Sequence, residues 1–510
     1  MMLMATHLNA GQRYVSPTGN DTNPGTVDYP FKTIAKGISV AVAGDTVVLR
    51  DGVYALTAGI TISKSGSASA LYYLVASPGE HPVLDCTAMP AGSRGIRLSG
   101  SYWYMRGLDI FHAPDNGMYI SGSNNVIDLC ILRENGDTGL QLDGGASNNR
   151  IINCDSYFNV DSSQGNADGF SPKLAVGSGN SFYGCRSWQN SDDGWDGYLR
   201  PANNVTTTIE NCWSFNNGYL KNGTASTGNG NGFKMGGSDN RDLEHNMILK
   251  NCLAFDNRVK GFDQNNNRGS MTLYNCTGYR NGTNYSISLA LDSGKTLEVK
   301  NCLALGTFGS LGSFAIQATN SWMPPFTVTN NDFLSIDTLG VRGPRKADGS
   351  LPDVPFMHLA PGSPLINAGT DVGLPFEGSA PDLGCFETSQ LVSIPDEEVA
   401  PLMVQLDQNY PNPFNPNSDI RYLISEFGIV RLSVFDLLGR ELIVLVNEKK
   451  APGEYEVRFD GSNLASGIYF YRLQVRPLDS AIGPALPAGR RDSKGGAGNL
   501  IQTRKMLLLK

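Results

Sequence analysis

The residues of this chain most suited to chemistry are four aspartates in two short segments, NADGF and SDDGWDGY. They are Asp168, Asp192, Asp193 and Asp196. Clustered carboxylates repel one another unless a proton or a cation separates them. Several oxygen donors on a rigid surface suit Ca²⁺, whereas Mg²⁺ favours fewer carboxylates and more water. The segments therefore predict a calcium site, with solvated turn aspartates as the alternative.

One lysine, Lys234, follows a glycine and an apolar residue in a third segment, NGFKMGG. A neighbouring dication favours the neutral amine and lowers the pKa of lysine from about 10.4, and a neutral lysine can act as a base. Cation and base together predict β-elimination from a uronic acid polymer, in which Lys234 abstracts the C5 proton and the metal stabilises the enolate-like intermediate. Hydrolysis requires one carboxyl group as acid and another as base. Four clustered aspartates can supply such a pair, so hydrolysis stays open as an alternative.

Further basic residues are candidates for holding the carboxylates of such a substrate, although similar residues more often face solvent. They are Lys173, Arg200, Lys260 and Arg268.

The bulk composition argues against two classes of partner. The formal net charge is -8 at pH 7 and no basic stripe is present, so we expect no nucleic acid. No apolar stretch reaches about 18 residues, so we expect no membrane span. The five histidines are scattered without zinc spacing, which argues against a histidine metal site. We expect a monomer.

A repeat must position these residues. Segments of the form apolar-x-x-Asn-Cys recur at intervals that fit a unit of about two dozen residues lengthened by insertions. They end at Cys154, Cys212, Cys252, Cys276 and Cys302, with looser copies at Cys130 and Cys185. Short strands broken by Asn and Gly predict a solenoid with three strands per coil. We expect each cysteine to face inward rather than form a disulfide, and the preceding asparagine to stack as an amide ladder.

A second repeated pattern, glycine followed by a large apolar residue, sets the register of the coils. The apolar residue faces inward, so the residues on either side of the pair face solvent. Asp168 and Asp193 then share one outer column on adjacent coils, and Asp196 and Lys234 share the other. Trp195 falls in the apolar column, which favours a core position over a sugar platform.

The solenoid is expected over residues 14–387. Small and apolar residues at helical spacing predict a capping helix at Phe31–Val42. An irregular segment ending at Glu387 is expected to close the other end. Residues 1–13 are interpreted as a truncated leader.

A change of composition predicts a second domain. Residues 388–401 are polar and contain proline, as is typical of a linker. Alternating segments in residues 402–510 predict a small antiparallel β-sandwich. Residues 477–499, rich in Gly, Pro and Arg, are expected to form a flexible excursion from it.

The motifs NADGF, SDDGWDGY and NGFKMGG, within a repeat from Tyr14 to Glu387, resemble polysaccharide lyase family 9, the pectate lyases and exopolygalacturonate lyases. The resemblance implies an all-β fold, a right-handed parallel β-helix, and calcium-dependent cleavage of polygalacturonate. It assigns the base to Lys234 and the calcium ligands to the four aspartates named above. The insertion at 219–229 is expected to form one wall of the cleft.

The end of the chain resembles the C-terminal sorting domain of the type IX secretion system of Bacteroidetes. The matching pieces are YPNPFNP, FDLLGRE, LASGIYFYRL and KMLLLK. This resemblance implies a partner, the type IX secretion machinery, and a protein that is secreted or attached to the cell surface.

The function expected from the sequence is therefore that of a calcium-dependent pectate lyase. Two alternatives remain open. One is a lyase acting on alginate, a glycosaminoglycan or rhamnogalacturonan, because fold and base do not fix the sugar. The other is a non-catalytic carbohydrate-binding or adhesive solenoid, which would tolerate the loss of Lys234.

Overall fold

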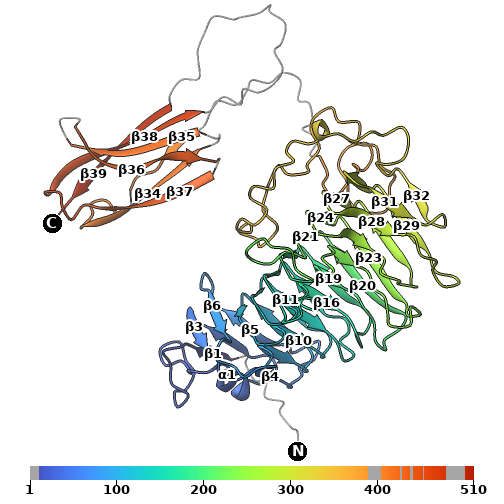
Figure 1. Ribbon diagram of the computed structural model, residues 1–510. Helices are drawn as coiled ribbons and strands as arrows, with labels where there is room; N and C mark the ends of the chain where they lie inside the picture. The colour runs from blue at the N-terminus through green and yellow to red at the C-terminus, as the bar shows by residue number, and fades with distance from the viewer. Residues whose placement is uncertain are drawn as a thin grey trace, which may run out of the picture. The chain divides into compact units, whose positions relative to one another are not determined.

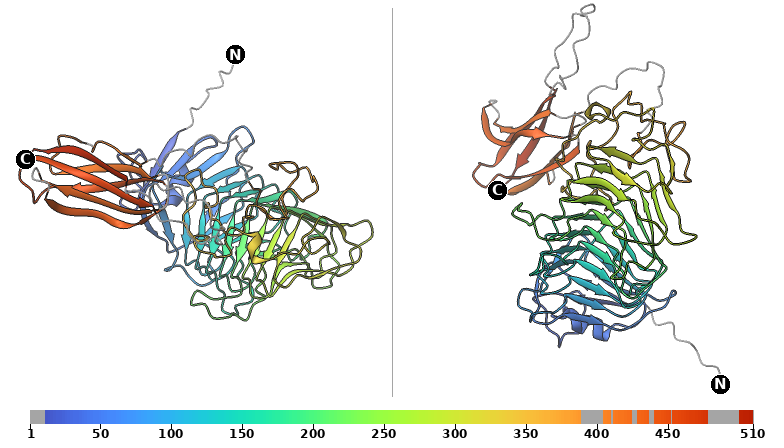
Figure 2. Two further views of the ribbon diagram at one scale, coloured as in Figure 1. Left: turned by 90° about the horizontal axis from the view of Figure 1, so that it is seen from above. Right: turned by 45° about the vertical axis from the view of Figure 1, so that its right-hand side comes forward.

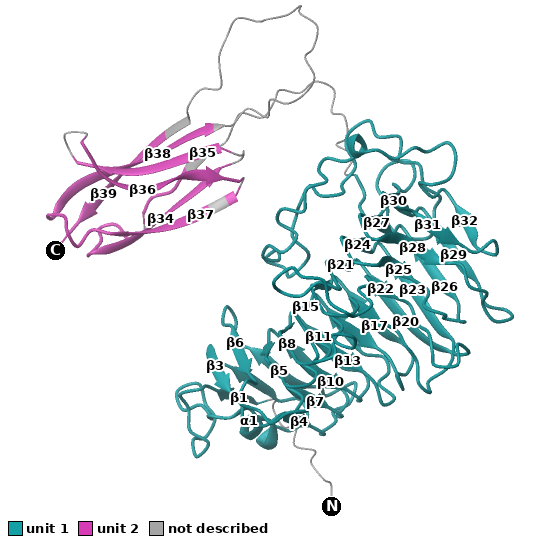
Figure 3. Cartoon of the chain, viewed as in Figure 1, with its two compact units in different colours: residues 1–391 teal, residues 392–510 magenta. Residues whose placement is uncertain are grey.

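A computed structural model describes residues 11–388, 404–409, 411–424, 428–436, 440–451, 453–477 and 500–509. The chain forms two compact units, residues 1–391 and 392–510 (Figure 3). The predicted leader lies outside the described residues except for residues 11–13, and the predicted linker except for Thr388.

The first unit consists of three parallel sheets (Figure 1). The chain winds through them in turn, so successive strands belong to different sheets. Sheet A contains β1 (Gln12–Val15), β2 (Thr46–Leu49), β5 (Tyr72–Ala76), β8 (Trp103–Arg106), β11 (Val126–Asp128), β14 (Arg150–Ile152), β17 (Asn180–Tyr183), β20 (Val205–Glu210), β23 (His245–Lys250), β26 (Met271–Tyr274), β29 (Leu297–Lys300) and β32 (Ile316–Ala318). Sheet B contains β3 (Gly52–Ala55), β6 (Pro82–Asp85), β9 (Asp109–Phe111), β12 (Ile131–Arg133), β15 (Asp155–Tyr157), β18 (Arg186–Trp188), β21 (Trp213–Phe215), β24 (Leu253–Phe255), β27 (Thr277–Tyr279) and β30 (Leu303–Leu305). Sheet C contains β4 (Ile60–Ile62), β7 (Ile96–Leu98), β10 (Met118–Ile120), β13 (Leu140–Leu142), β16 (Phe170–Pro172), β19 (Trp195–Asp196), β22 (Phe233–Lys234), β25 (Lys260–Asp263), β28 (Thr283–Ile287) and β31 (Gly309–Leu311).

Each coil therefore contributes one strand to each sheet, and the stacked coils are visible in both views of Figure 2. A three-stranded coil leaves room inside only for alternate side chains, and the inward-facing apolar residues of successive coils form one continuous core. The predicted parallel β-helix is confirmed. Trp195 is fully buried, as its apolar column predicts.

The repeating cysteines face this core as predicted. All nine cysteines are free thiols, and the eight from Cys86 to Cys302 are buried. Burial raises the pKa of the Cys276 thiol well above its usual range. These residues fill the core as small apolar side chains.

The predicted amide ladder is present at one step, where the Asn301 side chain donates to Oδ1 of Asn275 at 3.0 Å. The asparagines that precede the cysteines adopt the left-handed backbone conformation, for example Asn153 with φ 52° and Asn211 with φ 52°, and serve as turn residues. A continuous ladder lies instead on the turn after sheet B, where each buried Asn side chain donates to the next. It comprises Asn135, Asn159, Asn190, Asn217, Asn257, Asn281 and Asn284.

A short helix caps the first coils. It is α1 (Ile34–Val40), which begins three residues later than predicted because Thr33 accepts a hydrogen bond from the Lys36 amide and acts as the N-cap. At the other end of the helix, Lys64 donates to the carbonyl groups of Ile38, Ser39 and Ala41. Unpaired carbonyl groups at the C-terminus are thereby satisfied.

The chain after β32 is irregular, as predicted, apart from the 3₁₀ helix η1 (Asn330–Asp332). This closing segment covers the outer face of sheet B, where Phe356 packs against Phe255 and Tyr279. It is also joined to sheet B by an ion cluster in which Arg186 and Arg345 both contact Asp155, at distances of 2.6–2.8 Å.

The second unit is a small antiparallel domain, and this part of the prediction is confirmed. One sheet contains β33 (Val404–Leu406), β34 (Asn417–Ile424) and β37 (Gly453–Asp460). The other contains β36 (Glu441–Lys450), β35 (Gly428–Phe435), β38 (Gly467–Pro477) and β39 (Leu500–Leu508). Of the predicted flexible excursion, only Pro477 lies within the described residues. None of the helices in the described ranges is long and apolar enough to cross a membrane.

Candidate active site

The chemistry-bearing side chains lie on sheet C, in the register that the sequence predicts. Phe170 pairs with Trp195, and Trp195 pairs with Phe233. Asp196 therefore lies directly opposite Lys234 on the adjacent coil. The predicted column that contains these two residues is confirmed.

The glycine of each motif has a steric cause. A Cβ atom on Gly194 would lie 2.0 Å from the Ser214 hydroxyl and 2.6 Å from the Gly232 carbonyl oxygen. Neighbouring coils approach too closely here for any side chain. The glycines therefore fix the spacing at which the flanking aspartates of successive coils meet.

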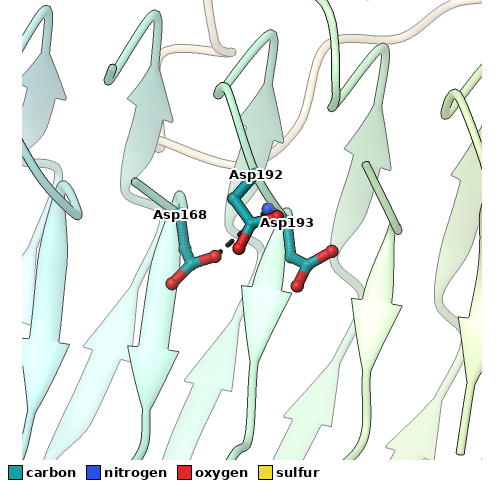
Figure 4. A group of neighbouring side chains, drawn as sticks. All are labelled: Asp168, Asp192 and Asp193. Carbon is teal, nitrogen blue, oxygen red and sulfur yellow. Dashed lines mark hydrogen bonds between the residues drawn. The ribbon is translucent and has the colours of Figure 1, made fainter. Parts of the chain in front are cut away.

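Three of the four aspartates form one cluster. Oxygen atoms of Asp168, Asp192 and Asp193 lie within 4.8 Å of one another (Figure 4). Asp168 comes from the coil of β16, and the other two come from the turn that leads into β19. The backbone amide of Asp193 donates to Oδ1 of Asp168 at 3.1 Å, which ties the two coils together.

Hydrogen bonds from the next coil orient the cluster. Oδ1 of Asp193 accepts from the Asn231 amide at 2.9 Å, and Oδ1 of Asp192 accepts from the Asn229 amide. Asn229 ends the insertion at 219–229, so this segment contacts the site directly. Asn229 also lines the cavity described below, as the expectation of a cleft wall requires.

Lys234 reaches into the same cluster. Its Nζ atom lies 3.1 Å from Oδ2 of Asp193 and 3.2 Å from Oδ1 of Asp196, and its side chain is 8% exposed. The ring of Tyr198 lies 5.7 Å from the same nitrogen. Asp196 is held in turn by the Tyr198 amide, which donates to Oδ1 at 3.0 Å.

The aspartates are electrostatically strained. Burial, together with the charges of Asp193 and Asp168, raises the pKa of Asp192 to about 9. Burial and the neighbouring carboxylates raise the pKa of Asp193 to about 7, although Lys234 opposes the shift. Burial also raises the pKa of Asp168. This chain alone therefore supplies too little positive charge for three ionised carboxylates.

Asp196 behaves differently from the other three. Burial acts to raise its pKa, but the charges of Lys234 and Lys173 outweigh burial and hold the pKa below its usual value. Its carboxylate is thus already neutralised by the two lysines, whereas Asp168, Asp192 and Asp193 form the under-compensated group.

The pKa of Lys234 differs from the lowered value expected from the sequence. Burial lowers it, but the charges of Asp193, Asp196, Asp168 and Asp192 outweigh burial and hold the pKa well above its usual value. The protein charges alone therefore favour the ammonium form. A neutral amine requires an additional positive charge at the carboxylates.

The donor set fits a hard cation. Oδ1 of Asn231 is a buried atom without a hydrogen-bond donor among the described residues, and Oδ2 of Asp193 accepts no hydrogen bond there, although the Lys234 ammonium lies 3.1 Å away. Buried oxygen atoms of this kind are costly unless a partner satisfies them. Carboxylate and amide oxygens are the ligands that Ca²⁺ prefers, and no histidine or cysteine stands among them.

Two of the four predicted substrate-binding residues lie at this site. Lys173 is buried, with Nζ 2.7 Å from Oδ2 of Asp168 and 3.6 Å from Oδ2 of Asp196. Arg200 is exposed and pairs with Asp239 at 2.6 Å.

The other two lie elsewhere, each in an ion pair of its own. Lys260 pairs with Asp263 at 2.8 Å, and Arg268 pairs with Asp292 at 2.9 Å. Neither lines the cavity that contains Lys234. Both side chains are directed to acidic partners on their own or neighbouring coils.

A cavity of about 420 Å³ opens over the cluster. Its walls carry both signs of charge and few apolar groups, as is suited to a polar, charged ligand. It is lined by Arg94, Asp115, Asp137, Gln141, Asp143, Gly165, Asn166, Lys173, Leu174, Asp192, Asp196, Tyr198, Arg200, Asn229 and Lys234.

Sequence reasoning missed part of this wall. Arg94 enters the cavity with its guanidinium 3.7 Å from the ring centre of Tyr119. Asp137 also lines it, and burial raises the pKa of that carboxyl to about 6. Asp137 precedes the pair Gly139–Leu140 by two residues, so the outer-column pattern did not select it. Arg94 directly precedes Gly95–Ile96, a pair on an earlier coil that the sequence analysis did not include.

Residues 13–301, more than half of the chain, match the family described as "Pel9A-like, right handed beta helix region". The chain belongs to this family. It is a polysaccharide lyase, and the predicted handedness of the β-helix is confirmed. A second match, over residues 408–478, is to the "Secretion system C-terminal sorting domain". The Pel9A-like protein is accordingly secreted or held at the cell surface, as predicted.

Individual relatives agree with this assignment. "Pectate lyase L" of Dickeya dadantii is 38% identical over 388 residues, which cover 73% of this chain and 90% of the relative. The crystal structure of pectate lyase Pel9A is similar with a TM-score of 0.69 and 37% identity, over 74% of this chain and 96% of that one. A solved rhamnogalacturonan lyase is similar with a TM-score of 0.62 and 28% identity, over 69% and 97%.

Proposed function

We propose that this protein is a calcium-dependent pectate lyase that cleaves polygalacturonate by β-elimination, with Lys234 as the base. The observation that carries the proposal is the contact of the Lys234 amine with Asp193, a member of an under-compensated carboxylate cluster, inside a polar cavity. The names of the relatives, which include pectate lyases from several organisms, support the choice of substrate.

The proposed calcium ligands are Asp168, Asp192 and Asp193, with Asp196 as a fourth that Lys173 and Lys234 share. When bound, the ion would supply positive charge that withdraws electron density from a uronate carboxylate and so acidifies the C5 proton. Oδ2 of Asp193, which already lies 3.1 Å from the Lys234 ammonium, would gain the ion as a second partner.

Lys234 is proposed to take the proton. Its ammonium and a dication at the same carboxylates repel one another, which favours the neutral amine that a base requires. Asp196 and the Tyr198 ring hold the amine at the mouth of the cluster. The C5–H electrons form the C4–C5 double bond as the bond to the C4 oxygen breaks, Nζ retains the C5 proton, and the departing oxygen takes a proton from solvent water.

Arg200 and Lys173 are proposed to bind substrate carboxylates, because both line the cavity as cations. Arg200 is the more accessible, since Lys173 is 4% exposed and committed to Asp168. Contacts of Lys260 and Arg268 with substrate stay predictions, because both side chains lie in ion pairs outside the cavity.

We further propose that the C-terminal unit addresses the protein to the type IX secretion machinery. Residues 408–478 carry the sorting-domain similarity, and they contain the antiparallel strands β34 to β38.

Hydrolysis is the less favoured chemistry. Acid and base carboxylates of glycosidases lie roughly 5–9.5 Å apart with room for a sugar or water between them. The oxygens of Asp168, Asp192 and Asp193 lie within 4.8 Å of one another, and a lysine contacts them directly.

A second candidate substrate is rhamnogalacturonan. The similarity to a solved rhamnogalacturonan lyase, at 28% identity and a TM-score of 0.62, favours it over the other uronate polymers considered. The cavity geometry serves either backbone, since both contain galacturonate.

A substrate panel tests the proposal. Full-length protein with calcium is mixed with polygalacturonate, rhamnogalacturonan or alginate, and the absorbance of the unsaturated uronide is followed. We expect the fastest gain on polygalacturonate and none in EDTA. If the absorbance rises on none of the three polymers, the lyase proposal is overturned. If it rises faster on rhamnogalacturonan than on polygalacturonate, rhamnogalacturonan is the substrate.

A further inference from the structure

A second cavity, of about 610 Å³, shares no lining residue with the proposed active site. Three arginines line it, Arg258, Arg280 and Arg342, and it is called the arginine cavity below. Its acidic lining residue is Asp256. The cavity is thus a local concentration of positive charge on a chain whose formal net charge is -8.

Two of these arginines lack an acidic partner. Arg280 is fully engaged, because Nε and Nη2 each donate to Asp256 at 2.8 Å. Arg258 and Arg342 form no ion pair within the portion of the chain that is described. The cavity therefore retains an excess of two positive charges.

The unpaired guanidinium groups are held in place by neutral groups. Nη2 of Arg342 donates to Oδ1 of Asn216 at 2.8 Å, and the guanidinium lies 5.7 Å from the ring centre of Phe215. Arg258 donates to the Gly228 carbonyl oxygen of the insertion. A pre-positioned planar fork is suited to two-point recognition of a carboxylate.

Neutral polar groups surround the arginines. Gln189 and Asn216 occupy equivalent left-handed turn positions on successive coils, with φ 50° and 53°, which places their amides along one edge of the cavity. Tyr219 supplies an aromatic ring at the insertion. Amides and an aromatic ring beside carboxylate-binding forks match an acidic sugar better than a small inorganic anion.

We propose that the arginine cavity is a second binding site for a uronate-bearing oligosaccharide. The choice of galacturonate as the sugar rests on the proposed function. The insertion at 219–229 borders both cavities, since Tyr219 and Gly223 line this one and Asn229 lines the other. A polymer long enough to occupy both sites binds more tightly, because binding at one site raises its effective concentration at the other. A short oligomer does not gain this affinity.

Calorimetric titration with galacturonate hexamer tests the proposal. The background is full-length Lys234→Ala, in which cleavage is removed, and the variants add Arg342→Gln or Arg280→Gln. We expect the fitted stoichiometry to fall by one site per chain in both. The matched control is Arg150→Gln, an exposed arginine on β14 that lines neither cavity. Unchanged stoichiometry in folded Arg342→Gln and Arg280→Gln would overturn the proposal.

A competition experiment distinguishes a site for a uronate sugar from a general site for anions. Inorganic phosphate and free galacturonate are each added before the hexamer. We expect free galacturonate to compete weakly and phosphate to leave hexamer binding within about twofold of its original strength. Phosphate that competes as well as galacturonate would show a general anion site and overturn the assignment to a saccharide.

A kinetic readout separates this proposal from the proposed function. In the otherwise native protein, we expect Arg342→Gln to raise KM for long polygalacturonate by about tenfold while KM for a trimer and kcat stay unchanged. A native protein that cleaves no uronate polymer but loses a hexamer site in Arg342→Gln would contradict the proposed function alone. Cleavage with an unchanged KM and unchanged stoichiometry would contradict the arginine cavity alone.

Discussion

The Nζ atom of Lys234 lies 3.1 Å from Oδ2 of Asp193, and neither side chain is more than 8% exposed. No hydrogen bond to this oxygen is formed among the described residues, so the Lys234 ammonium is its ionic partner. In the proposed site Lys234 and calcium would share this carboxylate, and the protonation of the lysine would depend on whether the ion neutralises it. The proposed roles of base and metal site therefore depend on each other.

Calcium is expected to stabilise the folded protein through this cluster. At a concentration about 100 times its Kd, a ligand adds roughly 2.7 kcal/mol to the free energy of unfolding. Thermal melting in a calcium series is therefore expected to show a rise in Tm for the native sequence and little rise for Asp193→Ala. Asp239→Ala, at an exposed aspartate outside the cluster, is the control. An equal rise in Asp193→Ala would place calcium elsewhere.

The stability of the chelated protein is expected to fall as the pH rises. The pKa of Asp192 is raised to about 9 in the folded state from an ordinary value of 3.8, so the folded state binds more protons between these values than the unfolded state does. Stability is then lost through this window. In EDTA, Asp192→Asn is expected to gain Tm relative to the native sequence at pH 8 and not at pH 4. A difference between the two proteins that does not change with pH would contradict the assignment.

The same reasoning gives the pH dependence of calcium binding. Ligands with raised pKa values must release protons when a cation binds, so apparent calcium affinity is expected to increase from pH 6 to pH 9. Calorimetry in two buffers of different ionisation enthalpy measures the protons released. Binding without proton release would contradict the raised pKa values of Asp192 and Asp193.

The ion cluster beneath the closing segment is expected to govern stability rather than activity. Asp155 neutralises two buried arginines, Arg186 and Arg345, and Arg186 also donates to the Val341 carbonyl. Removing one partner of a buried ion pair typically costs about 3–5 kcal/mol. Asp155→Ala is expected to lower the free energy of unfolding by this amount in chemical denaturation.

The matched control is Glu80→Ala, which removes a half-exposed partner of Arg50. Exposed pairs contribute about 0–1 kcal/mol, so a small change is expected. Equal losses in Asp155→Ala and Glu80→Ala would show that the buried cluster has no special role.

The sequence was sufficient to predict the solenoid and the register of Asp168, Asp193, Asp196 and Lys234. Parallel coils must align the repeated glycine–apolar pair, so one repeated motif fixes which outer residues meet. The sequence also predicted that the cysteines face inward, because an apolar residue that recurs once in each coil is most stable in the core.

Other features depend on contacts that no local pattern encodes. The continuous asparagine ladder follows sheet B rather than preceding the cysteines, because a left-handed turn residue occupies the predicted position. Lys260 and Arg268 were predicted to bind substrate, but each side chain turns towards an acidic partner outside the cavity. Arg345 reaches Asp155 across 190 residues of sequence, a contact set by the packing of the closing segment.

The most direct test of the account is the initial rate of uronide formation on polygalacturonate with saturating calcium, compared between the native sequence, Lys234→Ala and Lys250→Ala. Lys250 lies on β23, the strand that follows β22 in the chain, outside the cavity, and controls for loss of a lysine. Loss of a general base typically costs about 10²–10⁴-fold in rate. We predict a fall of this size in Lys234→Ala, with calcium-induced stabilisation retained, and none in Lys250→Ala. A rate for Lys234→Ala within a few-fold of the native rate would contradict the assignment of the base.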